Sequence, residues 1–218
     1  MNAFKLLGIS LLAVSALAQG GFTTLFNGKD LSRWQPGFTN WVIEDGTLAL
    51  KGREDGREHN DNYLWTKEQY GDFILELEYK APPDRANSGV FLRTSDIRDP
   101  VYTGIEVQVG HVSPGGQLLR NSVGGLYDLV APSKDAQKPG EWNKYVITCE
   151  GPQITVVLNG EQTAQVNLDR WTDTGRNPDG SKNKFKRPLR DFERRGYIGL
   201  QDHGLSVWYR NIRIRSLR

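Results

Sequence analysis

The sequence contains few of the residues that build disulfide frameworks and metal centres. One cysteine and three histidines occur among its 218 residues. One cysteine cannot form an internal disulfide, and the widely spaced His59, His111 and His203 match no common zinc motif. The sequence also lacks a Gly-x-Ser-x-Gly element, a phosphate-binding loop and a dinucleotide-binding motif. Nucleophilic hydrolases and nucleotide-dependent enzymes are therefore poor candidates.

An excess of charge of one sign is also absent. The 28 basic residues are nearly balanced by 26 acidic ones, so bulk charge gives no reason to expect a nucleic-acid partner. One local basic stretch, from Lys182 to Arg195, could bind an anion. Its interleaved acids and few aromatic residues favour a solvated loop instead.

The N-terminal apolar run is too short to span a membrane comfortably. It extends from Leu6 to Leu17, follows Lys5, and ends in the small-residue pattern Ala16-Leu17-Ala18. We interpret residues 1–18 as a signal peptide and residues 19–218 as one exported domain that does not insert into a membrane. A retained membrane anchor is the alternative.

The rest of the sequence is a series of short strand patterns separated by turns rich in glycine. Asp45-Gly46 predicts a two-residue hairpin between 41–44 and 47–50, and 73–79 alternates apolar and polar residues. Further strand patterns cover 87–93, 104–109, 145–149, 153–158, 161–166, 196–201 and 207–215. We expect an all-β sandwich of two antiparallel sheets. Cys149 falls in one of these patterns and is expected to be a buried, inert thiol.

Two long segments, 112–140 and 168–195, interrupt the strand patterns and predict loops that are functional or mobile. Trp171, Tyr102 and Tyr127 lie in or beside loops. Exposed flat aromatic rings stack on sugar rings, so these residues favour a carbohydrate ligand over a lipid or a nucleic acid.

Polar side chains project from two of the predicted strands. Glu106 and Gln108 share the face opposite Ile105, Val107 and Val109. Arg93 ends the preceding strand and could supply a fixed cation. We interpret this pair of strands as a functional site, although a solvated sheet face or a structural Glu–Arg pair would give the same pattern.

A second candidate site follows the strand pattern at 196–201. In Gln201-Asp202-His203-Gly204, the carboxylate of Asp202 could orient the imidazole of His203 and make it a general base. A hairpin turn with surface side chains is an equally good interpretation.

Ordered motifs along the chain resemble the 3-keto-disaccharide hydrolase domain family. The first is the opening Thr24-Leu-Phe-Asn-Gly-Lys-Asp-Leu-Ser-Arg-Trp34. The later motifs are Asn87–Arg93, Gly104–Val109, Gly125-Leu-Tyr127, Glu141-Trp-Asn143, Leu158-Asn-Gly160, Gly199–Gly204 and Arg210-Asn-Ile212. Each motif alone is weak, but the ordered set is specific and covers about residues 22–216.

The resemblance implies a concanavalin/LamG-like jelly-roll sandwich, exported to the periplasm or extracellular space of a bacterium. It also implies an enzyme that cleaves glycosides whose sugar carries a ketone at C3. The ketone acidifies the hydrogen at C2, so a base can remove that proton, the enolate can expel the C1 substituent, and water can add back. This route differs from the paired carboxylates of ordinary glycosidases.

On this hypothesis the base is either His203 with Asp202, or Glu106, and Arg93 stabilises the enolate oxygen. The remaining residues, expected to bind the carbohydrate, are Asn87, Gln108, Tyr127, Gln201 and His111. His111 stands where many relatives carry a nearby acidic residue. No cofactor is expected, and the sequence decides neither a divalent metal near Glu106 nor the oligomeric state. A non-catalytic carbohydrate-binding module is the main alternative, and an ordinary glycoside hydrolase comes third.

Overall fold

The computed structural model describes residues 21–37, 39–52, 62–110 and 116–217. The predicted signal peptide and His111 lie outside these ranges. Within them, no helix is both long and apolar enough to cross a membrane.

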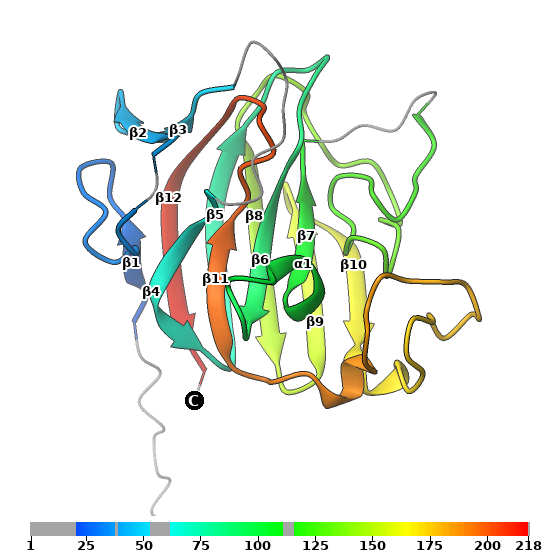
Figure 1. Cartoon of the computed structure of the whole chain (residues 1–218). Helices are drawn as coiled ribbons and strands as arrows, with labels where there is room; N and C mark the ends of the chain where they lie inside the picture. Colours follow the sequence, from blue (N-terminus) through cyan, green and yellow to red (C-terminus); the bar gives the residue numbers. More distant parts are fainter. Residues whose placement is uncertain (1–20, 38, 53–61, 111–115, 218) are drawn as a thin grey trace, which may run out of the picture.

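The described residues form two antiparallel sheets packed face to face (Figure 1). The larger sheet has eight strands in the order β10-β9-β8-β5-β12-β3-β2, with β1 also paired to β12, and the smaller has the order β4-β11-β6-β7. The larger sheet contains β1 (Thr23–Phe26), β2 (Trp41–Glu44), β3 (Thr47–Leu50), β5 (Phe73–Lys80), β8 (Asn143–Glu150), β9 (Gln153–Leu158), β10 (Glu161–Asn167) and β12 (Val207–Ser216). The smaller contains β4 (Leu64–Tyr70), β6 (Ser88–Thr94), β7 (Ile105–Val109) and β11 (Gly196–Leu200), and a short helix, α1 (Pro100–Thr103), connects β6 to β7. This architecture confirms the predicted all-β sandwich.

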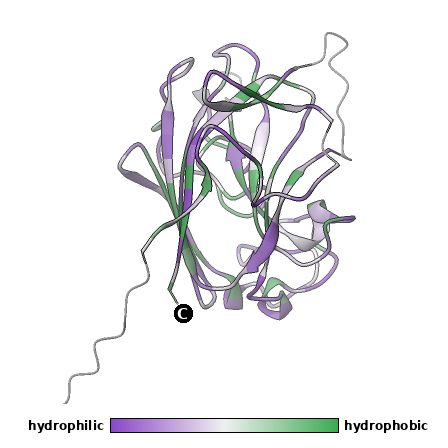
Figure 2. Cartoon of the chain, turned by 90° about the vertical axis from the view of Figure 1, so that its left-hand side faces the viewer, coloured by the Kyte–Doolittle hydropathy of each residue, from purple (hydrophilic) through white to green (hydrophobic). Residues whose placement is uncertain are grey.

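The main hydrophobic core lies between the two sheets and follows the alternation of the strands. In β5 every second residue from Phe73 to Tyr79 is buried, as the sequence pattern predicts. Figure 2 shows the sandwich from the side, with hydrophilic and hydrophobic residues interspersed along the strands. Cys149 is buried in this core, and burial raises the pKa of its thiol to about 12, which agrees with the predicted inert role.

The hairpin between β2 and β3 is formed by Asp45 and Gly46, both with positive φ, as predicted. Two strands were not recognised from the sequence. β1 is short, and β4 contains Lys67, Glu68 and Gln69, which interrupt its apolar pattern. β4 nevertheless pairs with β11 and completes the smaller sheet.

The two long loops meet the smaller sheet at β7. Backbone hydrogen bonds join Gln108 to Gly125 and Gly124, and the amide of Tyr127 donates to the carbonyl of Glu106 at 2.9 Å. Loop residues 122–130 therefore lie along the edge of β7 as an irregular extra strand. This pairing places the loops beside the polar face of β7.

Candidate functional site

The outward face of the smaller sheet carries a second, smaller cluster of buried side chains. Tyr63, Trp65 and Phe91 pack together here, with ring centroids 5.3–6.1 Å apart, and are separate from the main core. Glu106 pairs with Phe91 across β6 and β7, so its side chain lies on the same face. The face opposite the core is therefore buried and partly polar.

Two glycines allow side chains to lie close against this face. A Cβ atom at Gly89 would collide with the carboxylate of Glu106, and one at Gly199 would collide with the ring of Trp65. Neither glycine has a positive φ, so space rather than backbone conformation requires them. Gly89 thus leaves the room that the Glu106 carboxylate occupies over β6.

Glu106 forms an ion pair that sequence reasoning did not find. Its carboxylate lies 3.7 Å from the amine of Lys184, and the two side chains are 5% and 13% exposed. Burial raises the pKa of Glu106 to about 7, although Lys184 acts in the opposite direction. Burial likewise lowers the pKa of Lys184, against the attraction of Glu106. A carboxyl group with this pKa is populated in both its neutral and its ionised form near neutral pH.

Lys184 belongs to the basic stretch that we expected to be a solvated loop, and for this residue the expectation is wrong. Its backbone amide donates to the carboxylate of Asp128, and its amine lies 4.5 Å from the centre of the Tyr127 ring. Asp128 and Tyr127 belong to the loop that lines β7. The pairing of the two loops brings Lys184 to the site, a contact that a single loop sequence does not reveal.

A hydrogen-bonded chain connects the two predicted sites. The Nε2 group of Gln108 donates to Asn87 Oδ1 at 2.8 Å, and the Nδ2 group of Asn87 lies 3.0 Å from His203 Nε2. Because Asn87 Oδ1 accepts from Gln108, the Nδ2 group of Asn87 is the donor toward His203 and Nε2 is the acceptor. The structure therefore brings Asn87, Gln108 and His203 together in one hydrogen-bonded chain.

Asp202 and Gln201 are buried beside this chain. The carboxylate of Asp202 accepts hydrogen bonds from Asn40 Nδ2 at 2.8 Å and from the amide of Gly204 at 2.9 Å. Asp202 thus stabilises the turn that carries His203. Gln201 donates through Nε2 to the hydroxyl of Tyr63, so it belongs to the same outward face.

Arg93 does not join Glu106, and we withdraw it from the site. Its φ of 49° places it in a bulge, where the register between β6 and β11 shifts, and this breaks the alternation that put it beside Phe91. Its guanidinium instead bonds the carbonyl of Gly71 at 2.8 Å, the carbonyl of Gly151 at 2.7 Å and the carboxylate of Asp72 at 2.9 Å. Burial lowers the pKa of Arg93. Arg93 therefore connects turns of the sandwich.

A family model described as the 3-keto-alpha-glucoside-1,2-lyase-like domain matches residues 21–215. The chain belongs to this family.

Relatives of this family member extend over nearly its whole length. A 3-keto-disaccharide hydrolase from Bacteroides thetaiotaomicron is 30% identical over 233 residues, covering 90% of this chain and 79% of the relative. The crystal structure of a candidate glycosyl hydrolase from Parabacteroides distasonis ATCC 8503 is 33% identical, with a TM-score of 0.79, and the match covers 91% of this chain and 100% of that chain. A Bacillus subtilis protein with a galectin-like fold, at 15% identity and a TM-score of 0.57, shares the fold alone; that match covers 90% of this chain and 94% of that chain.

The aromatic residues expected at the site of this family member are distributed differently. Tyr127 lies at the site, whereas Trp171 is buried and donates to Asn177, so its predicted exposure is wrong. Tyr102 is half-buried in α1 and lies under the amine of Lys186, 3.9 Å from the ring centre. The missed aromatics, Tyr63 and Trp65, come from β4 and the residues before it, the strand that the sequence pattern did not show.

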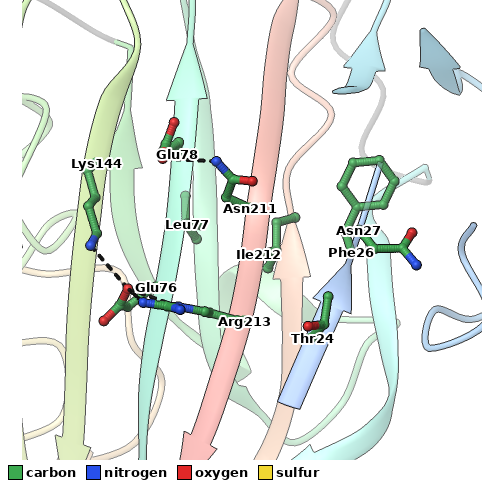
Figure 3. A pocket seen from close by; sticks show the side chains of 10 residues that line it. All are labelled: Thr24, Phe26, Asn27, Glu76, Leu77, Glu78, Lys144, Asn211, Ile212 and Arg213. Carbon is green, nitrogen blue, oxygen red and sulfur yellow. Dashed lines mark hydrogen bonds and ion pairs between the residues drawn. The ribbon is translucent and has the colours of Figure 1, made fainter. Parts of the chain in front are cut away.

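Two hollows lined by described residues lie outside this site. One, of about 360 Å³, crosses β1, β12, β5 and β8 on the outer face of the larger sheet (Figure 3). There Glu76 pairs with Lys144 and Arg213, and Glu78 pairs with Arg210 and Asn211. Because these side chains pair with one another, their arrangement is explained by the stability that they give to the sheet surface. The other, of about 610 Å³, lies between the two long loops, and Asp128 forms part of its wall.

In the part of the chain that the structure describes, no group of three or more His, Cys, Asp or Glu side chains is arranged to hold a metal ion. The positive charge beside Glu106 comes from Lys184. The site therefore contains a carboxyl–ammonium pair, a line of amide groups and an aromatic cluster.

Proposed function

We propose that this protein cleaves glycosides whose sugar is oxidised to a ketone at C3. The observation that carries the proposal is the Glu106–Lys184 pair, in which a buried carboxyl group with a pKa of about 7 lies 3.7 Å from an amine. A general base works best when its pKa lies near the working pH. The name of the Bacteroides relative, a 3-keto-disaccharide hydrolase, supports the same substrate class.

In the proposed reaction the ionised carboxylate of Glu106 removes the proton at C2. The electron pair of that C–H bond forms the enolate of the C3 ketone, and the ammonium of Lys184 stabilises the developing negative charge on the ketone oxygen. Collapse of the enolate breaks the bond from C1 to the leaving oxygen, which takes up the proton that Glu106 removed from C2. Water then adds across the resulting double bond, with oxygen at C1 and hydrogen at C2.

Glu106 is a better candidate for the base than His203. The lone pair of His203 Nε2 already accepts the hydrogen bond of Asn87, whose own orientation is set by Gln108. Protonation of Nε2 would place two donors against each other. We therefore assign His203 and Asn87 to positioning, and Lys184 to the stabilising role first expected of Arg93.

The proposal is tested by cleaving a 3-keto-α-glucoside in heavy water and analysing the sugar product early in the reaction. Proton abstraction predicts deuterium at C2 of the product, and loss of both cleavage and deuterium in Glu106→Gln. The 3-keto sugar product incubated alone with the protein controls for exchange after cleavage. Cleavage without deuterium would refute the proposed route, and sugar binding without cleavage would favour the non-catalytic binding module.

A further inference from the structure

Two buried amide oxygens on the outward face of the smaller sheet have no hydrogen-bond partner among the described residues. They are Oε1 of Gln108 and Oε1 of Gln201. The two residues are 1% and 6% exposed. A buried polar atom without a partner costs stability, and such atoms are rare in native proteins unless they serve a ligand or bind water.

The polarity of the Gln108 amide is fixed by its surroundings. Its Nε2 group donates to three oxygens: Asn87 Oδ1 at 2.8 Å, the carbonyl of Ser88 at 3.2 Å and the carbonyl of Val109 at 3.4 Å. Exchanging nitrogen and oxygen would bring the oxygen against three other acceptors. Gln108 therefore presents an acceptor, and no donor, to a ligand.

Gln201 is held on the side of β6 opposite to Gln108. Its amide nitrogen donates to the carbonyl of Gly89 at 2.9 Å, its carbonyl accepts from Ser88 Oγ at 2.7 Å, and its side-chain nitrogen donates to Tyr63. Gln108 pairs with Gly89 in the register of β6 and β7. The two glutamines thus flank Gly89 in one row, two strand spacings, or roughly 10 Å, apart in backbone position.

Glu106 leans over Gly89 between the two glutamines, with Lys184 beside its carboxylate. The row therefore offers an acceptor on each side, with one ammonium donor beside Glu106. A sugar hydroxyl can donate a hydrogen bond to an amide oxygen, but a ketone cannot. A ketone opposite either glutamine would leave two acceptors facing each other, whereas a ketone opposite Lys184 would be satisfied.

We propose that Gln108 and Gln201 are specificity-determining residues that each accept a hydrogen bond from one sugar hydroxyl and thereby turn the ketone toward Lys184. This inference takes the identity of the sugar from the proposed function. It adds the recognition rule: two hydroxyl groups that flank the reacting region are required as donors, and an oxidised or deoxygenated carbon at either position is rejected.

The test measures binding of a sugar that cannot be cleaved. 1,5-Anhydroglucitol oxidised at C3 has no leaving group at C1, and its 2-, 4- and 6-deoxy forms each lack one hydroxyl. Calorimetry compares wild type, Gln108→Met, Gln201→Met and the control Gln153→Met, an exposed glutamine on β9. Thermal unfolding checks that each variant is folded.

We expect Gln108→Met and Gln201→Met to bind the parent sugar roughly 10- to 100-fold more weakly than wild type does. For each variant, one deoxy sugar should bind equally well to variant and wild type, because the missing hydroxyl and the missing acceptor are partners. Gln153→Met should behave as wild type across the series.

Equal losses for all four sugars, or no loss, would overturn the inference. Wild-type binding that disappears when divalent cations are removed would also overturn it, because the oxygens would then be metal ligands. Absence of any binding to wild type would count against it too. Cleavage of a 3-keto-α-glucoside is assayed separately: a binding pattern without cleavage refutes the proposed function alone, and cleavage without the pattern refutes the inference alone.

Discussion

At the scale of single residues, the chemistry of this protein depends on the environment of Glu106. Its carboxylate is held over a glycine, is nearly excluded from solvent and lies beside an amine that is itself desolvated. Burial favours the neutral acid, and the amine favours the carboxylate. The balance puts the pKa of the group near 7, where both forms are populated.

Replacement of Glu106 by glutamine should separate catalysis from stability. We expect kcat for a 3-keto-α-glucoside to fall by about a hundredfold or more, because the base is removed. The pKa of Glu106 is raised from 4.5 to about 7 in the fold, so its contribution to the unfolding free energy is largest below pH 4.5 and is lost as the pH rises through 7. Wild type should therefore lose up to about 3 kcal/mol over this range, and Glu106→Gln should lose less. Urea unfolding at a series of pH values measures both, and parallel curves would contradict the assigned pKa.

Replacement of Lys184 by methionine should shift the pH dependence of the reaction. Lys184 lowers the pKa of Glu106, so without it that pKa rises above 7 and the ionised base is scarcer at neutral pH. We expect kcat/KM at pH 7 to fall by about tenfold or more, with its rising limb moved to higher pH. The exposed neighbour Lys182, changed to methionine, is the control. A lower rate with an unmoved pH profile would show that Lys184 does not act on Glu106.

At the scale of the strands, the outward face of the smaller sheet depends on two positions that carry no side chain. Gly89 on β6 and Gly199 on β11 leave room for the side chains of Glu106 and Trp65 to lie flat on the sheet. The neighbouring Phe91 and Tyr63 complete the cover. The strands therefore place the polar side chains of the site beside a cluster of aromatic rings.

Gly89→Ala should disable the site through this geometry. The new methyl group would collide with the Glu106 carboxylate, which has to move, so we expect a loss of kcat and a loss of about 1–3 kcal/mol in unfolding free energy. Gly71→Ala is the matched control, since its Cβ would meet the carbonyl of Arg194 at an ordinary 3.6 Å. Assay and urea unfolding of both variants test this, and full activity in Gly89→Ala would show that the carboxylate position is unimportant.

Most strands could be predicted from the sequence because alternation and turn residues are local signals. The hairpin at Asp45-Gly46 and the strand from Phe73 followed directly from these signals. The side chain of Arg93 was misplaced because one residue in a left-handed conformation reverses the alternation, and no residue type marks that position. Lys184 was missed because it reaches Glu106 through pairing of two long loops, a tertiary contact without a local pattern.

At the scale of the whole molecule, Arg93 connects the layers. Gly71 and Asp72 join β4 of the smaller sheet to β5 of the larger, and Gly151 lies in the turn from β8 to β9. Arg93, itself on β6, bonds all three. One buried guanidinium therefore fixes the ends of both sheets relative to each other.

Arg93→Met should destabilise the fold without a specific effect on the chemistry. Removal of a buried cation that bonds Asp72 and two carbonyls is expected to cost about 3 kcal/mol or more in urea unfolding. At urea concentrations too low to unfold the variant, its kcat should remain near that of wild type. Arg98→Met, which removes an exposed surface pair with Asp96, is the control and should leave stability unchanged. A stable but inactive Arg93→Met would restore the catalytic role that the sequence first suggested.

The position of β12 in the larger sheet has a consequence for biosynthesis. This strand pairs with β5, β3 and β1, and all three precede it in the chain by well over a hundred residues. A ribosome releases the chain from its N-terminus. The edges of these three strands that pair with β12 therefore stay unpaired until residues 207–216 emerge. The larger sheet therefore closes only after residues 207–216 have emerged, and until then the unpaired edges of β5, β3 and β1 are open to mispairing and to chaperones.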